Sequence, residues 1–277
     1  MITSPLRYPG GKGKLYKQVK QIIVENNLQT RAYTEPFAGG FGIGIKLLLN
    51  GDIGRVIIND FDYHIYAIWH CIFYETDAFI NLIERTAINL NLWRQQKEIY
   101  NDYVNHSLLE VGFSAFFLNR TNYSGVLTGG PIGGVKQTSK YKIDCRFNKH
   151  KLIELIRRIG QYRNQVELYN LDVNQFIDTI ILPRQNELFI NFDPPYVTKG
   201  EILYKNYFND DDHKKLADKI ITNLQDAQWI MTYDDCELIK ELYKSYNPQD
   251  FNLQYYAGTK RLGNELLISN IHKISEI

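Results

Sequence analysis

Cysteine is scarce in this chain of 277 residues, and its three copies stand far apart at Cys71, Cys145 and Cys236. No two of them form a CxxC pair, so their spacing excludes a disulfide framework and argues against a structural zinc. No apolar run is long enough to cross a bilayer, and residues 1–7 lack the basic-then-apolar order of a signal peptide. We therefore expect a cytoplasmic protein that binds neither metal nor membrane.

An excess of charge of one sign is lacking as well. The 32 Lys and Arg residues nearly balance the 31 Asp and Glu residues, which leaves a net charge of +1. Any signal for nucleic-acid binding must therefore be local. Residues 136–163 carry nine Lys or Arg against two acids. Such a run is compatible with a solvated face, but it adjoins the glycine-rich and aromatic stretch 119–134, which favours binding of a phosphate backbone.

The glycine motifs that bind phosphates are also missing. The basic loop 9–14 fails the Walker A pattern, and the turn 36–44 does not read GxGxxG. That turn nevertheless follows a strand at 32–35 and precedes a helix, and a second strand at 55–58 ends in Asn59 and Asp60. An acid at this place, about 20 residues after the glycine turn, accepts hydrogen bonds from a ribose. The pattern favours a ribose-bearing cofactor that is bound without phosphate recognition.

Strands and helices alternate along the chain with one long interruption. Between residues 63 and 163 helical patterns dominate, at 66–74, 93–104, 108–118 and 152–159. Alternation resumes with strands at 166–169, 188–190 and 229–233, helices at 173–180, 213–224 and 236–246, and two late strands at 253–257 and 265–271 that flank 258–261. We predict an α/β sheet domain from residues 1–62 and 164–277, and an inserted, mainly helical domain from residues 63–163.

The apolar run 188–190 ends in Asn191-Phe192-Asp193-Pro194-Pro195-Tyr196. Taken alone, this could be a turn that only ends a strand. At the carboxyl end of a strand, however, it places a carboxylate, fixed backbone carbonyls and an aromatic ring together. This combination suits an amino group on a planar heterocycle, because the amine donates to two acceptors while the ring stacks on tyrosine.

The motifs together resemble a known family. The ordered set consists of Pro9-Gly10-Gly11-Lys12, Glu35 to Gly40, Asn59-Asp60, Asn119-Arg120-Xaa-Asn122-Tyr123-Xaa-Gly125 and Asp193-Pro194-Pro195-Tyr196. It resembles the Dam-like, D12 class (α-group) N6-adenine DNA methyltransferases. The resemblance implies a Rossmann-like S-adenosylmethionine-dependent methyltransferase sheet in which the helical insertion recognises the DNA target. The implied reaction transfers a methyl group to N6 of a flipped-out adenine in double-stranded DNA.

The same resemblance implies roles for individual residues. The catalytic set is Asp193, Pro194, Pro195 and Tyr196. The implied S-adenosylmethionine site comprises Tyr8, Lys12, Glu35, Pro36, Phe37, Ala38, Gly39, Gly40, Asp60, Asp172 and Asp193. The expected DNA-binding residues are Asn119, Arg120, Asn122, Tyr123, Lys136, Lys140, Lys142, Arg146, Lys260 and Arg261. The resemblance also implies a cognate restriction endonuclease as a candidate partner.

The sequence departs from the family after the recognition signature. Where Dam carries an arginine that reads a base, this chain has Thr128 followed by Gly-Gly-Pro-Ile-Gly-Gly. The GATC target is therefore not carried over. Two alternatives stay open: a methyltransferase that acts on RNA or protein, and a non-catalytic DNA-binding relative. Asp193 counts against the first, because those enzymes more often show Asn-Pro-Pro-Tyr or Asn-Pro-Pro-Phe.

Overall fold

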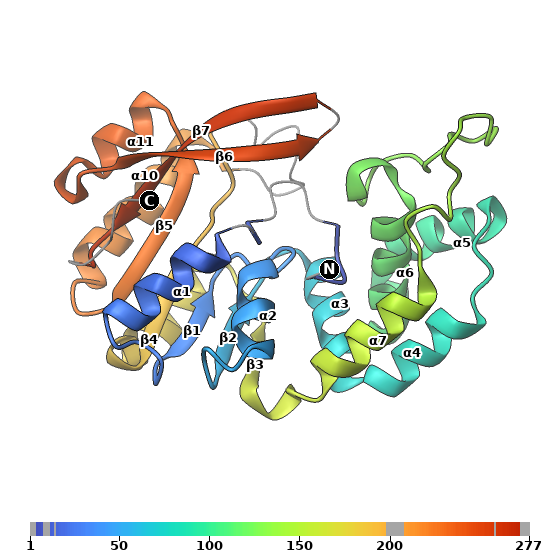
Figure 1. Ribbon diagram of the computed structural model, residues 1–277, viewed down its shortest axis with the longest axis horizontal. Helices are drawn as coiled ribbons and strands as arrows, with labels where there is room; N and C mark the ends of the chain where they lie inside the picture. Colours follow the sequence, from blue (N-terminus) through green and yellow to red (C-terminus); the bar gives the residue numbers. More distant parts are fainter. Residues whose placement is uncertain (1–3, 8–11, 14, 198–207, 258, 272–277) are drawn as a thin grey trace.

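One mixed sheet forms the centre of the protein. The computed structural model describes residues 4–7, 12–13, 15–197, 208–257 and 259–271, without the side chains of 251–264. In these ranges seven strands pair in the order β3-β2-β1-β4-β5-β7-β6, and only β7 runs antiparallel to its neighbours, β5 and β6 (Figure 1). The strands are β1 Ala32–Glu35, β2 Val56–Asn59, β3 Val166–Tyr169, β4 Leu188–Phe192, β5 Gln228–Asp234, β6 Gln249–Ala257 and β7 Thr259–Ser269.

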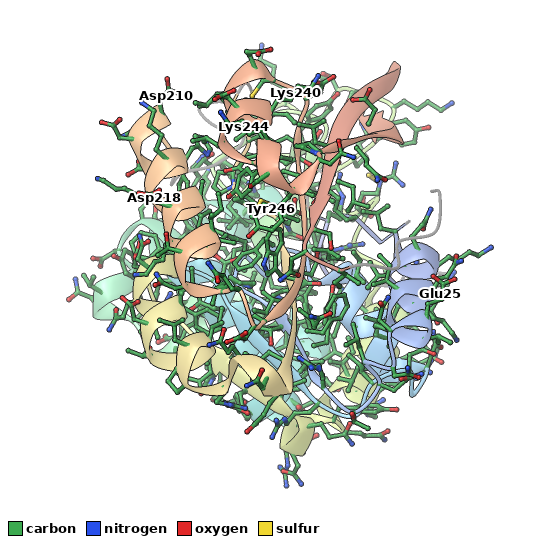
Figure 2. The ribbon with its side chains drawn as sticks, turned by 90° about the vertical axis from the view of Figure 1, so that its left-hand side faces the viewer. Glu25, Asp210, Asp218, Lys240, Lys244 and Tyr246 are labelled. Atoms are coloured by element: carbon green, nitrogen blue, oxygen red, sulfur yellow. The ribbon has the colours of Figure 1, made fainter. Side chains whose placement is uncertain are left out.

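The central strands are buried on both faces because helices cover each side of the sheet. Successive residues alternate between two hydrophobic clusters: Ile57 packs in one, and its neighbours Val56 and Ile58 pack in the other. The cluster with Val56 contains α1 Tyr16–Glu25, α2 Gly42–Leu49 and α3 Tyr63–Tyr74. The cluster with Ile57 contains α8 Val173–Phe176, α10 Asp210–Asn223 and α11 Glu237–Leu242. Figure 2 shows the charged side chains of this second layer, such as Asp210 and Asp218, pointing away from the sheet.

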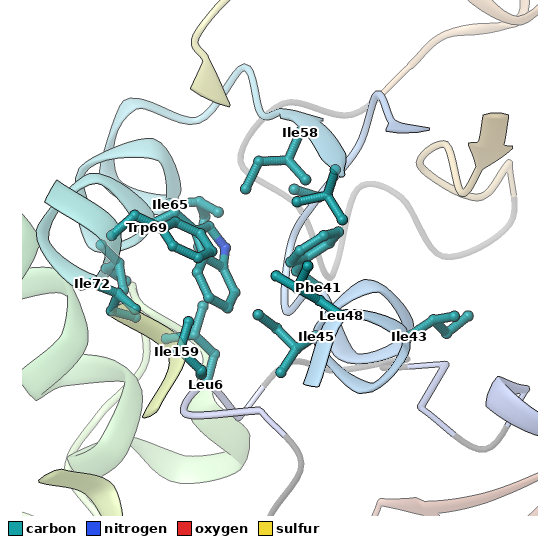
Figure 3. Close-up of a cluster of buried hydrophobic side chains, with 14 of the residues drawn as sticks. Leu6, Phe41, Ile43, Ile45, Leu48, Ile58, Ile65, Trp69, Ile72 and Ile159 are labelled. Carbon is teal, nitrogen blue, oxygen red and sulfur yellow. The ribbon is translucent and has the colours of Figure 1, made fainter. Parts of the chain in front are cut away.

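An aromatic contact joins the glycine turn after β1 to α3. Phe41 lies edge-on to Trp69, with ring centroids 5.7 Å apart at 82° (Figure 3). The Trp69 indole Nε1 donates a 2.9 Å hydrogen bond to the Gly39 carbonyl. Phe41 itself adopts the left-handed conformation, with φ 43°, which a bulky residue keeps only where packing enforces it. The core therefore holds the backbone of the turn in place.

The helical region contains four further helices, α4 Thr76–Arg85, α5 Leu90–Asn101, α6 Leu108–Thr121 and α7 Lys149–Gly160. Aromatic rings of α4 and α6 pack edge to face; the ring centroids of Phe79 and Phe116, for example, are 5.2 Å apart. The helix α4 lies outside the predicted helical ranges. Since α3 packs on both the sheet and this region, the two parts share one continuous core. The division at residues 63 and 163 stays a prediction.

Short helical turns fill several connections. They are η1 Tyr103–Asn105, η2 Tyr123–Gly125, η3 Arg163–Gln165, η4 Ile177–Ile181, η5 Leu182–Glu187 and η6 Lys244–Tyr246. The segment predicted as one helix over 173–180 is therefore the short α-helix α8, which continues into the π-helix η4 and the 3-10 helix η5.

The predicted α/β fold is confirmed, with one correction near the C-terminus. Thr259, Lys260 and Arg261 were expected between two strands, but they lie within β7, where Lys260 pairs with Tyr256 and Arg261 with Tyr255. The antiparallel hairpin is longer than its apolar pattern indicates, because backbone pairing continues past the buried residues. Among the described residues, no helix has the length and apolar character that a membrane span requires, and no cluster of His, Cys, Asp and Glu could hold a metal.

Candidate active site

The candidate site lies where three neighbouring parallel strands end. Strand β1 has β2 on one side and β4 on the other, so the direction of winding reverses between β1 and β4. Ligands of open α/β sheets bind at this switch point, beyond the carboxyl ends of the strands. Glu35 ends β1, Asp60 follows β2 and Asp193 follows β4. The structure thus brings the three predicted acids to one edge of the sheet.

Asp60 holds the glycine turn. Its Oδ2 accepts a 2.8 Å hydrogen bond from the Gly39 amide, and its Oδ1 accepts one of 2.9 Å from the Asp62 amide. Gly39 has φ 45°, a conformation that suits glycine. Burial, followed by repulsion from Asp62, raises the pKa of Asp60 to about 7. A carboxyl group that titrates near neutrality at a ligand edge is a candidate functional group.

Asn59 organises the same edge, a role that its place in the motif did not predict. Its Nδ2 donates to the carbonyls of Pro36 and Leu171, both at 3.0 Å, and its Oδ1 accepts from the Leu171 amide at 2.9 Å. The buried amide therefore joins the loops that follow β1 and β3 across the end of β2. The backbone groups of both loops are satisfied by this one side chain.

Glu35 is buried inside a hydrogen-bonded chain. The Tyr33 hydroxyl donates to Glu35 Oε1 at 2.8 Å, and Asn191 Nδ2 donates to the Tyr33 oxygen at 2.8 Å. Burial raises the pKa of Glu35 to about 8, although the bond from Tyr33 opposes that shift. Asn191 was part of the strand-end motif, but its support of Glu35 through Tyr33 arises only because β1 and β4 are neighbours.

Asp193 and Tyr196 form the acceptor and aromatic parts of the site. Asp193 Oδ1 accepts a 3.2 Å hydrogen bond from the Thr232 hydroxyl and lies 3.1 Å from Lys12 Nζ. The Tyr196 hydroxyl donates to Glu265 Oε1 at 2.8 Å and also contacts Lys12 Nζ. Pro194 is buried and Pro195 is half-buried. The predicted catalytic residues therefore lie together, and the structure adds Thr232 and Glu265 to them.

The other predicted cofactor residues lie in different surroundings. Pro36, Ala38 and Gly40 are buried in the turn after β1, where the Gly40 carbonyl accepts a 2.6 Å bond from Ser4. Phe37 is half-buried against Phe208. Asp172 is exposed, and its side chain caps α8 through the Asn174 amide at 2.8 Å. Tyr8 lies outside the described residues.

Three residues expected to bind DNA are buried. Asn119 is 1% exposed, Arg120 6% and Asn122 0%. Asn119 bonds both the amide and the carbonyl of Arg7, each at 2.8 Å. Asn122 accepts from Trp93 Nε1 at 2.7 Å and donates to the carbonyls of Val126 and Leu127. Arg120 donates to the Arg146 carbonyl. The structure gives these side chains a role in shaping the loop, which differs from the expected direct contact.

Five of the remaining candidates for DNA contact face outward. Tyr123 is 69% exposed at the tip of a loop that the Asn122–Pro131 bridge closes. The exposed basic side chains beyond it are Lys136, Lys140, Lys142 and Arg146. Lys260 and Arg261 are described in their backbone alone.

Gly125 fits this loop against the N-terminal segment. It has φ +79°, and a Cβ at this position would lie 2.2 Å from the Arg7 carbonyl oxygen. Gly125→Ala is expected to lower the free energy of unfolding by about 1–3 kcal/mol, because it adds both strain and overlap. Urea denaturation measures this change. Gly130→Ala in the same loop is the matched control, since its Cβ meets nothing within 4 Å. Equal stability of the two variants would contradict the proposed fit.

Phe61 lies at the same edge of the sheet, and the motif analysis did not single it out. Phe61 follows Asp60 directly and is 57% exposed, so its ring faces solvent next to the strand-end acid. The signal was present in the sequence as an aromatic residue after a strand-end acid. Glu265 carried no comparable local signal.

The strand order and the acids at the strand ends define the Rossmann-like fold of S-adenosylmethionine-dependent methyltransferases. The chain belongs to the D12 class of N6 adenine-specific DNA methyltransferases, whose family profile matches residues 8–257. It is 27% identical over 235 residues to the type II methyltransferase M.MjaIII of Methanocaldococcus jannaschii, covering 76% of this chain and 77% of that protein. A solved structure, the rRNA methyltransferase aviRa of Streptomyces viridochromogenes, aligns over 91% of this chain and 83% of its own, at 11% identity and a TM-score of 0.36.

Proposed function

We propose that this protein transfers the methyl group of S-adenosylmethionine to N6 of an adenine within a specific site in DNA. The observation that carries the proposal is the position of Asp193-Pro194-Pro195-Tyr196 at the end of β4, beside Glu35, which ends β1, and Asp60, which follows β2. A carboxylate and an aromatic ring meet there, next to the glycine turn that follows β1. Family membership supports the choice of adenine in DNA.

The residues at the sheet edge fit S-adenosylmethionine. Asp60 presents a half-buried carboxyl group that would accept hydrogen bonds from the ribose hydroxyls. Gly39 and Gly40 allow close approach of the backbone to the methionine part, and the Glu35 carboxyl group would accept a hydrogen bond from its amino group. The exposed ring of Phe61 would pack on the adenine end. When bound, the cofactor supplies an electrophilic methyl group on a sulfonium.

The chemistry of the target amine explains the two acceptors. The lone pair of adenine N6 is delocalised into its ring, so the nitrogen is a weak nucleophile. In the proposal, Asp193 and the Pro194 carbonyl accept the two N6 hydrogens and orient the lone pair, while Tyr196 stacks on the base. Positioning and electrostatics then provide the rate enhancement without a strong base. Because these groups cannot reach a stacked base, the adenine must leave the duplex.

Charge near the recognition loop supports a DNA partner. Burial and repulsion from Arg7 and Arg146 lower the pKa of Arg120 to about 10. In the described part of the chain, none of these three arginines forms an ion pair with a carboxylate. A DNA phosphate beside the exposed Arg146 would supply an anion to this group of arginines, and the exposed Tyr123 would then face the duplex. The type II name of M.MjaIII favours a cognate restriction endonuclease as a second partner.

Methyl transfer from radiolabelled S-adenosylmethionine tests the proposal. Unmethylated bacterial duplex DNA is expected to become labelled, with N6-methyladenine as the product after digestion and with the modified bases in one short sequence. Total RNA and protein from the same cells serve as competing acceptors. Label confined to RNA or protein would overturn the DNA assignment, and DNA labelled at cytosine would overturn the adenine assignment.

A further inference from the structure

We propose that Glu265 is a positioning residue of the active site: it holds the Lys12 ammonium and the Tyr196 hydroxyl, and thereby keeps Asp193 available as an acceptor for adenine. This inference rests on the proposed function and deepens it. Glu265 lies on β7, opposite Asp234 of β5 in the antiparallel pair. Its carboxylate reaches the site from the hairpin and not from the strand ends that carry the other acids.

The contacts form a closed network. Glu265 Oε2 lies 2.8 Å from Lys12 Nζ, and Glu265 Oε1 accepts the 2.8 Å hydrogen bond from Tyr196. Lys12 Nζ also contacts the Tyr196 hydroxyl and lies 3.1 Å from Asp193 Oδ1. One carboxylate therefore fixes both the lysine and the tyrosine, each through a different oxygen. The hydroxyl end of the tyrosine ring cannot shift without breaking one of these bonds.

Burial makes Glu265 the main ion-pair partner of Lys12. The side chains of Lys12 and Glu265 are 6% and 2% exposed, whereas that of Asp193 is 32% exposed. A buried charge is stable only when it is paired and hydrogen-bonded. Each of the two buried charges therefore needs the other. Burial raises the pKa of Glu265, and Lys12 and Tyr196 counteract that rise, which agrees with a carboxylate that depends on these partners.

Asp193 keeps one oxygen for the substrate. Its Oδ1 accepts the hydrogen bond from Thr232 and pairs with the Lys12 ammonium. Within the described ranges, no hydrogen bond goes to its Oδ2. An adenine amino group would use this second oxygen. If Glu265 lost its charge, Asp193 would be the one carboxylate among the described residues that still pairs with Lys12. The ammonium would then compete with the adenine amine for the acceptor that the reaction requires.

The inference predicts a loss of turnover in Glu265→Gln. We expect kcat for methyl transfer to DNA to fall about ten- to hundredfold, the usual range for a residue that orients a functional group. The dissociation constant of S-adenosylmethionine is expected to change little. Glu241→Gln is the matched control, since Glu241 is a surface residue that pairs with Lys244, and its kcat should equal that of the wild type.

A double-mutant cycle tests whether Glu265 acts through Lys12. Lys12→Met alone should lower activity. Adding Glu265→Gln to it should cause little further loss, because no ammonium remains to compete with the adenine amine for Asp193. The double variant removes both buried charges together, so no unpaired charge is left to prevent folding. If Glu265→Gln alone does not fold, the double variant is compared with Lys12→Met.

The outcomes separate this inference from the proposed function. Transfer to adenine by the wild type, with an unchanged kcat in Glu265→Gln or fully additive losses in the cycle, would overturn the inference alone. A lower melting temperature with normal kcat would reduce Glu265 to a stabilising residue and overturn it as well. Failure of the wild type to methylate DNA would overturn the proposed function, and the inference with it.

Discussion

Asp193→Asn is expected to lower kcat for methyl transfer to adenine by about 10²–10³-fold, the loss seen when one preorganised polar group of an active site is removed. The substitution keeps the size of the side chain but replaces one acceptor oxygen by an NH₂ donor. That donor would face the adenine amine, which also donates, so the two groups would repel. It would also leave Lys12 without one of its two carboxylate partners. Single-turnover methylation of duplex DNA at saturating cofactor measures the effect.

Measuring kcat and the affinity for S-adenosylmethionine together makes the Asp193→Asn prediction specific to the chemical step. S-adenosylmethionine affinity should change much less than kcat, because the lost interaction forms with the base in the transition state. Asp226→Asn is the control, since Asp226 is exposed and far along the chain from the strand-end motif. A kcat within about twofold of the wild type in Asp193→Asn would remove Asp193 from the catalytic role, since an amino-group acceptor must contribute more than this.

The affinity for S-adenosylmethionine is expected to rise with pH through about 7, following the ionisation of Asp60. The pKa of this carboxyl is raised to about 7 by burial and by Asp62, so it is largely protonated at pH 6. Only the ionised form accepts hydrogen bonds from both ribose hydroxyls. One pH unit below the midpoint, affinity should therefore be about tenfold weaker than on the plateau. Titration calorimetry between pH 5.5 and 7.5 measures it, in a range where Glu35, with a pKa of about 8, remains mostly protonated.

Two variants isolate the carboxyl responsible. Asp60→Asn should bind S-adenosylmethionine more weakly by about 1.5–3 kcal/mol above pH 7, and its affinity should no longer show the step. Asp62→Asn should keep a step but move its midpoint to lower pH, because it removes the neighbouring charge while retaining an oxygen to cap α3 through the His64 amide. A step that persists unchanged in Asp60→Asn would assign the titration to another group.

The recognition loop gives these predictions a structural context. Asn119 binds the backbone of Arg7, Arg120 reaches the carbonyls of Arg146 and Pro5, and Ser4 bonds the Gly40 carbonyl. Residues 4–7 therefore lie between the glycine turn of the proposed cofactor site and the loop that carries Tyr123. Figure 1 shows the helical region and the β6–β7 hairpin on opposite sides of this segment.

Much of the fold followed from short stretches of sequence. Strands β1, β2, β4 and β5 are almost entirely buried, and a parallel sheet covered on both faces requires such short apolar runs. The strand-end acids and the glycine turn were also local signals, since each stands within a few residues of the strand that positions it. The helix α4 was missed although it is amphipathic, and the start of β7 was misplaced because backbone pairing leaves no mark in side-chain periodicity.

The sequence by itself determined which chemical groups stand at the strand ends: Glu35, Asp60 and the Asp193-to-Tyr196 motif. Only the tertiary structure decided how these groups are paired and which residues face solvent. Lys12 and Glu265 are 253 positions apart, yet they form an ion pair that is almost completely buried. Asn119 and Asn122 belong to a recognition signature, yet their side-chain amides donate to carbonyls of the protein's own loop. The physical reason is that burial and hydrogen-bond partners depend on packing between distant segments, and no local pattern records which segments meet.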